Sequence, residues 1–273
     1  MQKNLQATKR IDIFRYKEDR WPVAIILMLT IVDFTLYFAV ESAAVLIVYY
    51  LFMIIPKGII CSWNHHHQHL STLRNKSLNR ALEFFYALHT GVTTHLWRLH
   101  HVLGHHLNFL DQEKDESRWQ RKDGTQMGVL EYTIKVGITA YPRGFMVGKR
   151  YPGQLGPFVV FTAVTFLGVA TLVWFKPVAG TILFVLPMIT SLFFTAYVTY
   201  DHHTGLGTED EFEASYNNLN PIFNFITGNL GYHTAHHHKQ GVHWSKLPAL
   251  HAKIADKIPE YLYQKSMVTH RAQ

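Results

Sequence analysis

Four long apolar runs constrain this chain more than any other feature, because each is long enough to cross a bilayer as a helix. A transmembrane helix needs about 20 apolar residues, and the runs are about 18 to 23 residues long. They pair into two hairpins, with turns at Glu41 and Ser42 and at Lys176 and Pro177. The sequence therefore predicts an all-α membrane protein with four transmembrane helices. The expected spans are residues 22–40, 43–60, 155–175 and 178–200.

The basic residues predict how these helices are oriented. The chain has 26 Lys and Arg residues, and all but Lys176 lie on the side that carries both termini when Lys57 is counted at that end of its span. Polar segments rich in Lys and Arg stay in the cytoplasm. We therefore expect an integral, multi-pass membrane protein with both termini in the cytoplasm. The net charge of +7 then indicates attraction to anionic lipid, and no pattern in the chain points to nucleic acid.

The remaining residues form one expected cytoplasmic helical cap, which comprises residues 61–154 and 201–273. We expect a surface helix over residues 9–20, an amphipathic helix between 70 and 95, and an in-plane or re-entrant segment over 129–147. The sequence shows no internal repeat and no linker, so residues 1–273 are expected to form a single domain. Cys61 is the only cysteine, which rules out an internal disulfide or a four-cysteine iron–sulfur module.

Clustered histidines are the chemical signature of the cap. The chain has 19 histidines, and most of them fall into tight groups with members three or four residues apart. Such residues share one face of an α-helix, so a group can direct several ring nitrogens at one point. Neutral imidazole is a common transition-metal ligand, and the pattern predicts a metal site. The three main groups, which we call boxes one, two and three, are residues 65–69, 101–106 and 233–237.

The order of these motifs, interleaved with two membrane hairpins, resembles the integral-membrane fatty acid desaturase and hydroxylase superfamily. The most specific stretch is Asn-Leu-Gly-Tyr-His-Thr-Ala-His-His-His at 229–238, followed by His-Trp-Ser-Lys-Leu-Pro at 243–248. The resemblance covers roughly residues 21–250. It implies a mushroom-like fold in which four transmembrane helices lie under a cytoplasmic cap that holds a histidine-rich dimetal site, usually with iron.

The resemblance also implies which histidines bind the two metal ions, although box one and the pair at 202–203 leave alternatives open. Box two has three residues between its first histidine and the following pair, as in relatives that hydroxylate alkanes. Many desaturases have two residues there. The implied ligands are His65, His69, His101, His105, His106, His203, His233, His236 and His237, with His66, His67 and His202 as alternates.

The implied function is that of an O2-dependent di-iron oxidoreductase that acts on unactivated C–H bonds of a fatty acid or acyl lipid, with desaturation as the favoured outcome. Hydroxylation of a fatty acid or alkane and oxidative decarboxylation to a terminal alkene are the alternatives. The two electrons would come from an external ferredoxin, rubredoxin or cytochrome b5 type protein and its reductase. A metal transporter is an alternative of another class, but it would need more polar residues inside its spans than Asp33.

Further side chains are candidates for supporting roles. Carboxylates and amides near the histidines can orient the rings, and a cation at the cap can bind a carboxylate or activated headgroup. The aromatic residues Phe84, Phe85, Phe193, Phe194 and Tyr197 are candidates for the walls of an acyl-chain tunnel. The orienting candidates are Asn108, Asp111, Asp201 and Asn229, and the headgroup candidates are Arg98 and Arg143.

Overall fold

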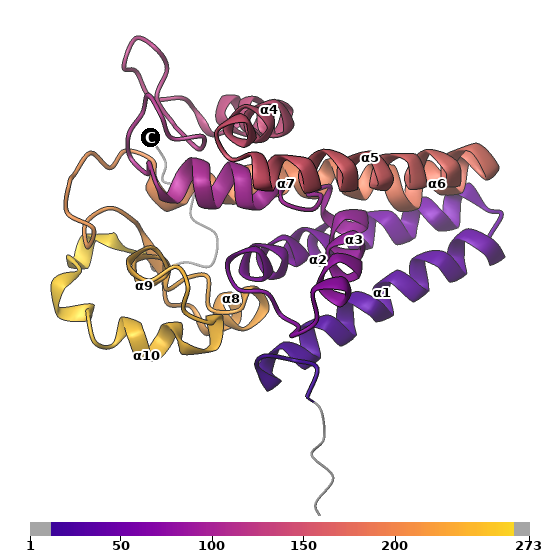
Figure 1. Cartoon of the computed structure of the whole chain (residues 1–273), viewed down its shortest axis with the longest axis horizontal. Helices are drawn as coiled ribbons and strands as arrows, with labels where there is room; N and C mark the ends of the chain where they lie inside the picture. The colour runs from indigo at the N-terminus through magenta and orange to yellow at the C-terminus, as the bar shows by residue number, and fades with distance from the viewer. Residues whose placement is uncertain (1–11, 265–273) are drawn as a thin grey trace, which may run out of the picture.

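The computed structural model describes residues 12–264, and four of its helical stretches lie where the spans were expected. Within that part of the chain, four helical stretches are long and apolar enough to cross a membrane. Both hairpin turns lie at one end of the long axis in Figure 1, whereas α9 and α10 lie at the other. The spans are α1 (Arg20–Ala39), α2 (Ala43–His69), α5 (Pro152–Phe175) and the stretch Pro177–His203.

The hairpin turns form where the sequence predicted them. Ser42 begins α2 as an N-cap, and its Oγ accepts a hydrogen bond from the Val45 N–H at 3.5 Å. Pro177 begins the return of the second hairpin, where its missing N–H costs no helical hydrogen bond. That return is divided into α6 (Pro177–Gly180), the π-helical η3 (Thr181–Val185) and α7 (Leu186–His203).

Lys57 lies further inside its helix than the sequence suggested. It is not at the cytoplasmic end of its span, because α2 continues past it to His69. Its side chain is buried, and its Nζ lies 2.8 Å from Oδ2 of Asp33 on α1. A lysine can lie this deep because the carboxylate compensates its charge locally.

A short helix packs against all four long helices. Asn75 caps α3 (Lys76–Thr90) by accepting from the Leu78 N–H at 3.1 Å, and Gly91 ends it with a φ of 66°. Its buried face includes Leu82, and the helix contacts α1, α2, α5 and α7. This confirms the amphipathic, core-facing helix expected between residues 70 and 95.

The N-terminal segment differs from the surface helix that we expected. Among its described residues, Phe14 forms an antiparallel bridge with Leu73, and only the 3-10 turn η1 (Lys17–Asp19) precedes α1. The Arg15 N–H donates to the Thr72 carbonyl at 3.0 Å, so this backbone is bonded to another segment instead of to itself. Residues 9–11 lie outside the described part of the chain.

The segment expected to lie in the membrane plane is the helix α4 (Val129–Arg150). It is not among the candidate spans, and it packs against α7 and the π-helical η2 (Arg98–His106). Residues 107–128 connect η2 to α4 as an irregular loop.

Short elements complete the cap. β1 pairs in parallel with β2, with Asn217 opposite Tyr263 and Asn218 opposite Gln264. The last part of the expected helical cap is divided into short helices and turns, and residues 265–273 lie outside the described range. The elements are β1 (Asn217–Asn218), α8 (Pro221–Thr227), α9 (His233–His238), η4 (Trp244–Lys246), α10 (Leu247–His251), η5 (Ala255–Lys257), η6 (Glu260–Leu262) and β2 (Tyr263–Gln264).

Candidate metal centre

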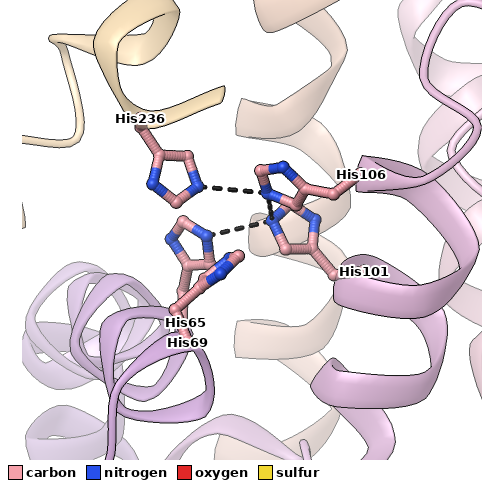
Figure 2. A group of neighbouring side chains, drawn as sticks. All are labelled: His65, His69, His101, His106 and His236. Carbon is pink, nitrogen blue, oxygen red and sulfur yellow. Dashed lines mark hydrogen bonds between the residues drawn. The ribbon is translucent and has the colours of Figure 1, made fainter. Parts of the chain in front are cut away.

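Three distant segments bring five histidine rings to one point, which we call cluster A. Each ring offers one nitrogen, and these five nitrogens all lie within 4.8 Å of one another. Figure 2 shows the rings directed toward a common centre from α2, η2 and α9. Cluster A consists of His65, His69, His101, His106 and His236.

A second group, cluster B, consists of His105, His203 and His237, whose nitrogens also lie within 4.8 Å of one another. His203 Nε2 is 3.3 Å from His105 Nε2 and 3.1 Å from His237 Nε2. The Nε2 of His233 approaches the same His203 nitrogen at 3.1 Å. The nine histidines named from sequence as metal ligands therefore divide into cluster A, cluster B and His233 beside cluster B.

The winding of η2 decides which rings of box two belong together. The sequence spacing suggested that His101 and His105, four residues apart, would face one point. Because η2 is a π-helix, its hydrogen bonds span five residues and its side chains follow a wider turn. His101 instead joins His106 in cluster A, while His105 joins cluster B. One short helix thus contributes to both groups.

The arrangement of ring nitrogens in cluster B favours a cation between the rings. His203 Nδ1 must donate to the Ala214 carbonyl at 2.7 Å, so in a neutral ring its Nε2 carries only a lone pair. Three other rings point an Nε2 at that atom, which can accept one proton. At least two of these contacts therefore cannot be hydrogen bonds, and each ring whose Nε2 carries no proton brings a further lone pair to the same point. A metal ion would satisfy every one of these lone pairs.

Cluster A likewise brings several ring nitrogens into close contact. His101 Nε2 lies 2.9 Å from both His65 Nε2 and His106 Nε2, and His236 Nε2 lies 3.1 Å from His106 Nε2. Within the described residues, His69 Nε2 has no hydrogen-bond partner at all. Burial, followed by the neighbouring imidazoles, keeps the rings outside the spans neutral. It lowers the pKa of His101, His106, His233, His236 and His237 well below 6.5.

The alternate histidines are turned toward other partners. His66 Nε2 lies 3.0 Å from the Thr227 carbonyl, and His67 Nε2 lies 3.3 Å from Glu83 Oε1. The His202 ring packs against that of His233, with centroids 4.0 Å apart. None of the three contributes to cluster A or cluster B as these are formed by the described residues.

Sequence reasoning missed the carboxylate that orients a cluster ring. Both oxygens of Asp115 lie 2.9 Å from His105 Nδ1, and the side chain is buried. This contact fixes the ring so that Nε2 faces cluster B. The signal was weak, because Asp115 belongs to an irregular loop that contains several other acidic residues.

Three of the four orienting candidates contact other groups. Asn108 donates to the Gly104 carbonyl at 3.2 Å, and Asn229 donates to the Trp244 carbonyl at 3.2 Å. Asp111 pairs with Lys114 at 2.9 Å in the exposed part of the loop. Asp201 lines the large cavity described next.

An apolar cavity of about 410 Å³ leads to the histidines. His65 and His101 of cluster A belong to its wall, and Ile55 on α2 marks its other end. From Ile55 to His65 the α-helical rise covers about 15 Å. Of the five aromatic residues expected there, Phe194 and Tyr197 line the wall, whereas Phe84, Phe85 and Phe193 are not among the described residues that line it.

The two headgroup candidates are not part of this cavity. Among residues 12–264, the side chains that line it include neither Arg98 nor Arg143. Arg98 is exposed at the start of η2, and Arg143 on α4 donates to the Glu116 carbonyl. A headgroup contact of either residue would have to lie outside the cavity wall.

Comparison with known proteins agrees with this geometry. The model of the family described as fatty acid desaturase matches residues 8–268. No curated protein matches the chain. The match covers nearly the whole sequence, including both histidine clusters and all four candidate spans.

Proposed function

Because the chain belongs to the fatty acid desaturase family, we propose that it is a membrane-bound, O2-dependent di-iron enzyme that introduces a double bond into an acyl chain. The supporting observation is that the apolar cavity meets cluster A at His65 and His101. A substrate carbon chain in that cavity would lie next to the histidine nitrogens, as reaction at a C–H bond requires.

The histidine clusters fit two iron ions. Cluster A offers five imidazole nitrogens, and cluster B offers three, with His233 as a fourth. Nitrogen ligands of this kind suit ferrous iron. When bound, the iron would supply the O2 activation that attacks an unactivated C–H bond. The protein's own part is to fix the rings, through Asp115 and the Ala214 carbonyl, and to keep water from the apolar cavity.

The proposed substrate is the acyl chain of a lipid that enters from the bilayer. Ile55 lines the cavity and is 54% exposed on α2, so the cavity approaches the surface that lipid would cover. The wall contains apolar side chains from both α2 and α7, among them Ile59 and Val198, and these suit a hydrocarbon chain.

The overall reaction needs an external electron donor. The acyl chain gives up two hydrogens, O2 takes up four electrons and four protons, and two waters form. Two electrons must therefore come from a carrier of the ferredoxin, rubredoxin or cytochrome b5 type with its reductase. The single cysteine of the chain cannot hold an iron–sulfur cluster. We place both termini and the clusters on the cytoplasmic side, where such carriers are available.

The test is mass spectrometry of lipids and volatile hydrocarbons from membranes that contain the purified, iron-loaded protein with O2, a reductase and a carrier. An internal alkene that requires every component supports desaturation. An alcohol would assign hydroxylation and a terminal alkene would assign decarboxylation. If the iron-loaded protein yields none of these products from a panel of acyl lipids and free fatty acids, the proposal is wrong.

A further inference from the structure

A chain of aromatic rings connects cluster A to the outer part of the cap. Trp63 on α2 lies in the middle, with its ring centroid 5.3 Å from that of Trp244 and 6.1 Å from that of His66. The His66 ring lies 5.2 Å from His65 and 6.5 Å from His236, both in cluster A. The rings therefore form a continuous contact path in which Trp63 is buried and Trp244 is half-buried.

The outer end of this path has an acceptor for the indole proton. Trp244 Nε1 donates to Asp19 Oδ1 at 2.7 Å, and the Asp19 side chain is 10% exposed. The same oxygen lies 3.1 Å from His243 Nε2, and Tyr16 stacks on the His243 ring at 3.8 Å. By contrast, the indole nitrogens of Trp97 and Trp119 have no hydrogen-bond partner within residues 12–264.

This pairing suits one-electron oxidation of Trp244. An indole that loses an electron becomes a strong N–H acid, so a carboxylate in hydrogen-bond contact takes the proton and leaves a neutral radical. Electron transfer slows steeply with distance, and the intervening rings of Trp63 and His66 divide the path into short steps. Trp97 is also close to cluster A, at 5.5 Å from His65, but its indole nitrogen lacks this acceptor.

We propose that Trp244 and Trp63 form a protective electron relay, which supplies electrons to cluster A when O2 has been activated and no acyl chain is present to be oxidised. The inference rests on the proposed function, because it needs an oxidising centre at the histidines. Without the relay, the oxidising equivalents would be consumed by the imidazoles themselves.

The electron balance of the relay is complete. Trp244 loses one electron, which passes through Trp63 and His66 to the oxidised centre, and its Nε1 proton moves to Asp19. A reduced one-electron carrier of the class that supports turnover returns the electron to Trp244, and the proton returns from Asp19. Over a full substrate-free cycle, the carrier supplies two electrons for O2 activation, the relay passes on two more in place of those from the acyl chain, and four protons from solution complete the reduction of O2 to two waters.

The test compares Trp63→Phe, Trp244→Phe and Asp19→Asn with the control Trp174→Phe. Trp174 is 84% exposed at the end of α5 that adjoins the hairpin turn at Lys176, and it is not part of the relay. Each protein is loaded with iron to the same content and is incubated with O2, reductase and reduced carrier but no lipid. Oxygen adducts on each histidine and tryptophan are then measured by peptide mass spectrometry, together with the iron that remains bound.

We expect the wild type and Trp174→Phe to collect adducts mainly on Trp244 and to keep their iron. In the three relay variants, adducts on the cluster A histidines should rise several-fold and iron should be lost. Asp19→Asn keeps both indoles and removes only the proton acceptor. Adducts and iron loss in this variant therefore report on proton transfer and not on the loss of a ring. If all four variants match the wild type while O2 is consumed, the relay is wrong. If the iron-loaded wild type consumes no O2 with the reductase, the proposed function itself fails, and the relay fails with it.

Discussion

Two buried polar clusters in this protein differ in how completely their hydrogen bonds are satisfied. In the first, between the spans, Lys57 Nζ lies 2.9 and 2.8 Å from the two oxygens of Asp33 and 3.4 Å from the Leu183 carbonyl. The Tyr49 hydroxyl donates to Asp33 at 2.7 Å, and His89 Nε2 meets the Thr30 hydroxyl at 2.9 Å. Within this network, only His89 Nδ1 has no hydrogen bond among the described residues.

The histidine clusters in the cap show the opposite pattern. Their Nε2 atoms face one another at 2.9 to 3.3 Å, and of the three contacts at His203 Nε2 at most one can be a hydrogen bond. The difference shows how a structural polar cluster can be told from a ligand-binding one. The Asp33 network is held by its own charges, whereas the histidine clusters need a cation from outside the chain to become stable.

The largest expected effect follows from removing a ring of the unsatisfied clusters. His236→Ala in cluster A or His237→Ala in cluster B should lower the bound iron from about two ions per chain to about one or fewer and abolish turnover. Elemental analysis and product mass spectrometry check this. His238→Ala is the matched control, because His238 directly follows the motif but pairs with Glu211 at 2.9 Å. Equal iron content in all three variants would contradict the assignment of the clusters.

Mutations in the Asp33 network should change the free energy of unfolding of the protein and not its iron content. Lys57→Met leaves a buried carboxylate without its cation, and breaking such a pair costs about 3–5 kcal/mol. Asp33→Asn combined with Lys57→Met removes both charges and keeps an acceptor for Tyr49, so it should recover most of this loss. Denaturation in detergent micelles, with and without iron, measures both. If the double variant is as unstable as Lys57→Met, the unpaired carboxylate is not the cause of the lost stability, and this expectation is wrong.

Part of this comparison could be predicted from the sequence. The long apolar runs and the spacing of the histidines can be read directly from the order of the residues. Lys57 was misplaced, since a charged residue near the end of an apolar run suggests the membrane surface. Only the packing of α1 against α2 shows that Asp33 compensates it. The sequence also could not predict that the histidines of box two divide between cluster A and cluster B. An α-helical period groups His101 with His105, and nothing in the nine residues of η2 indicates a π-helix.

A smaller effect is expected where a single carboxylate supports a cluster. Asp115→Asn keeps a side chain of the same shape but removes the charge that orients His105, and such changes lower metal affinity about 10- to 100-fold. Titration of the metal-free protein with ferrous iron under anaerobic conditions checks the affinity. Asp111→Asn is the control, because Asp111 lies in the same loop and pairs only with Lys114 and nearby backbone groups. If both variants bind iron like the wild type, the Asp115 contact does not tune the site.

The smallest expected effect is the contribution of one cluster histidine to the pH dependence of stability in the metal-free protein. Burial and the adjacent imidazoles lower the pKa of His236 well below 6.5 in the folded state. Below pH 6.5 the unfolded chain therefore binds a proton that the folded chain does not, and stability falls as the pH falls. His236→Gln removes this difference, so the slope should decrease by up to about 1.4 kcal/mol per pH unit.

Denaturation of the metal-free protein between pH 7.5 and about pH 5, a range chosen around the ordinary histidine pKa, measures this slope. His238→Gln is the control for the loss of a histidine outside both clusters. A steeper slope in His236→Gln would mean that the folded state already holds a proton on this ring. The close contacts between ring nitrogens in cluster A would then be stabilised by protonation, and the contrast with the Asp33 network would be smaller than the geometry indicates.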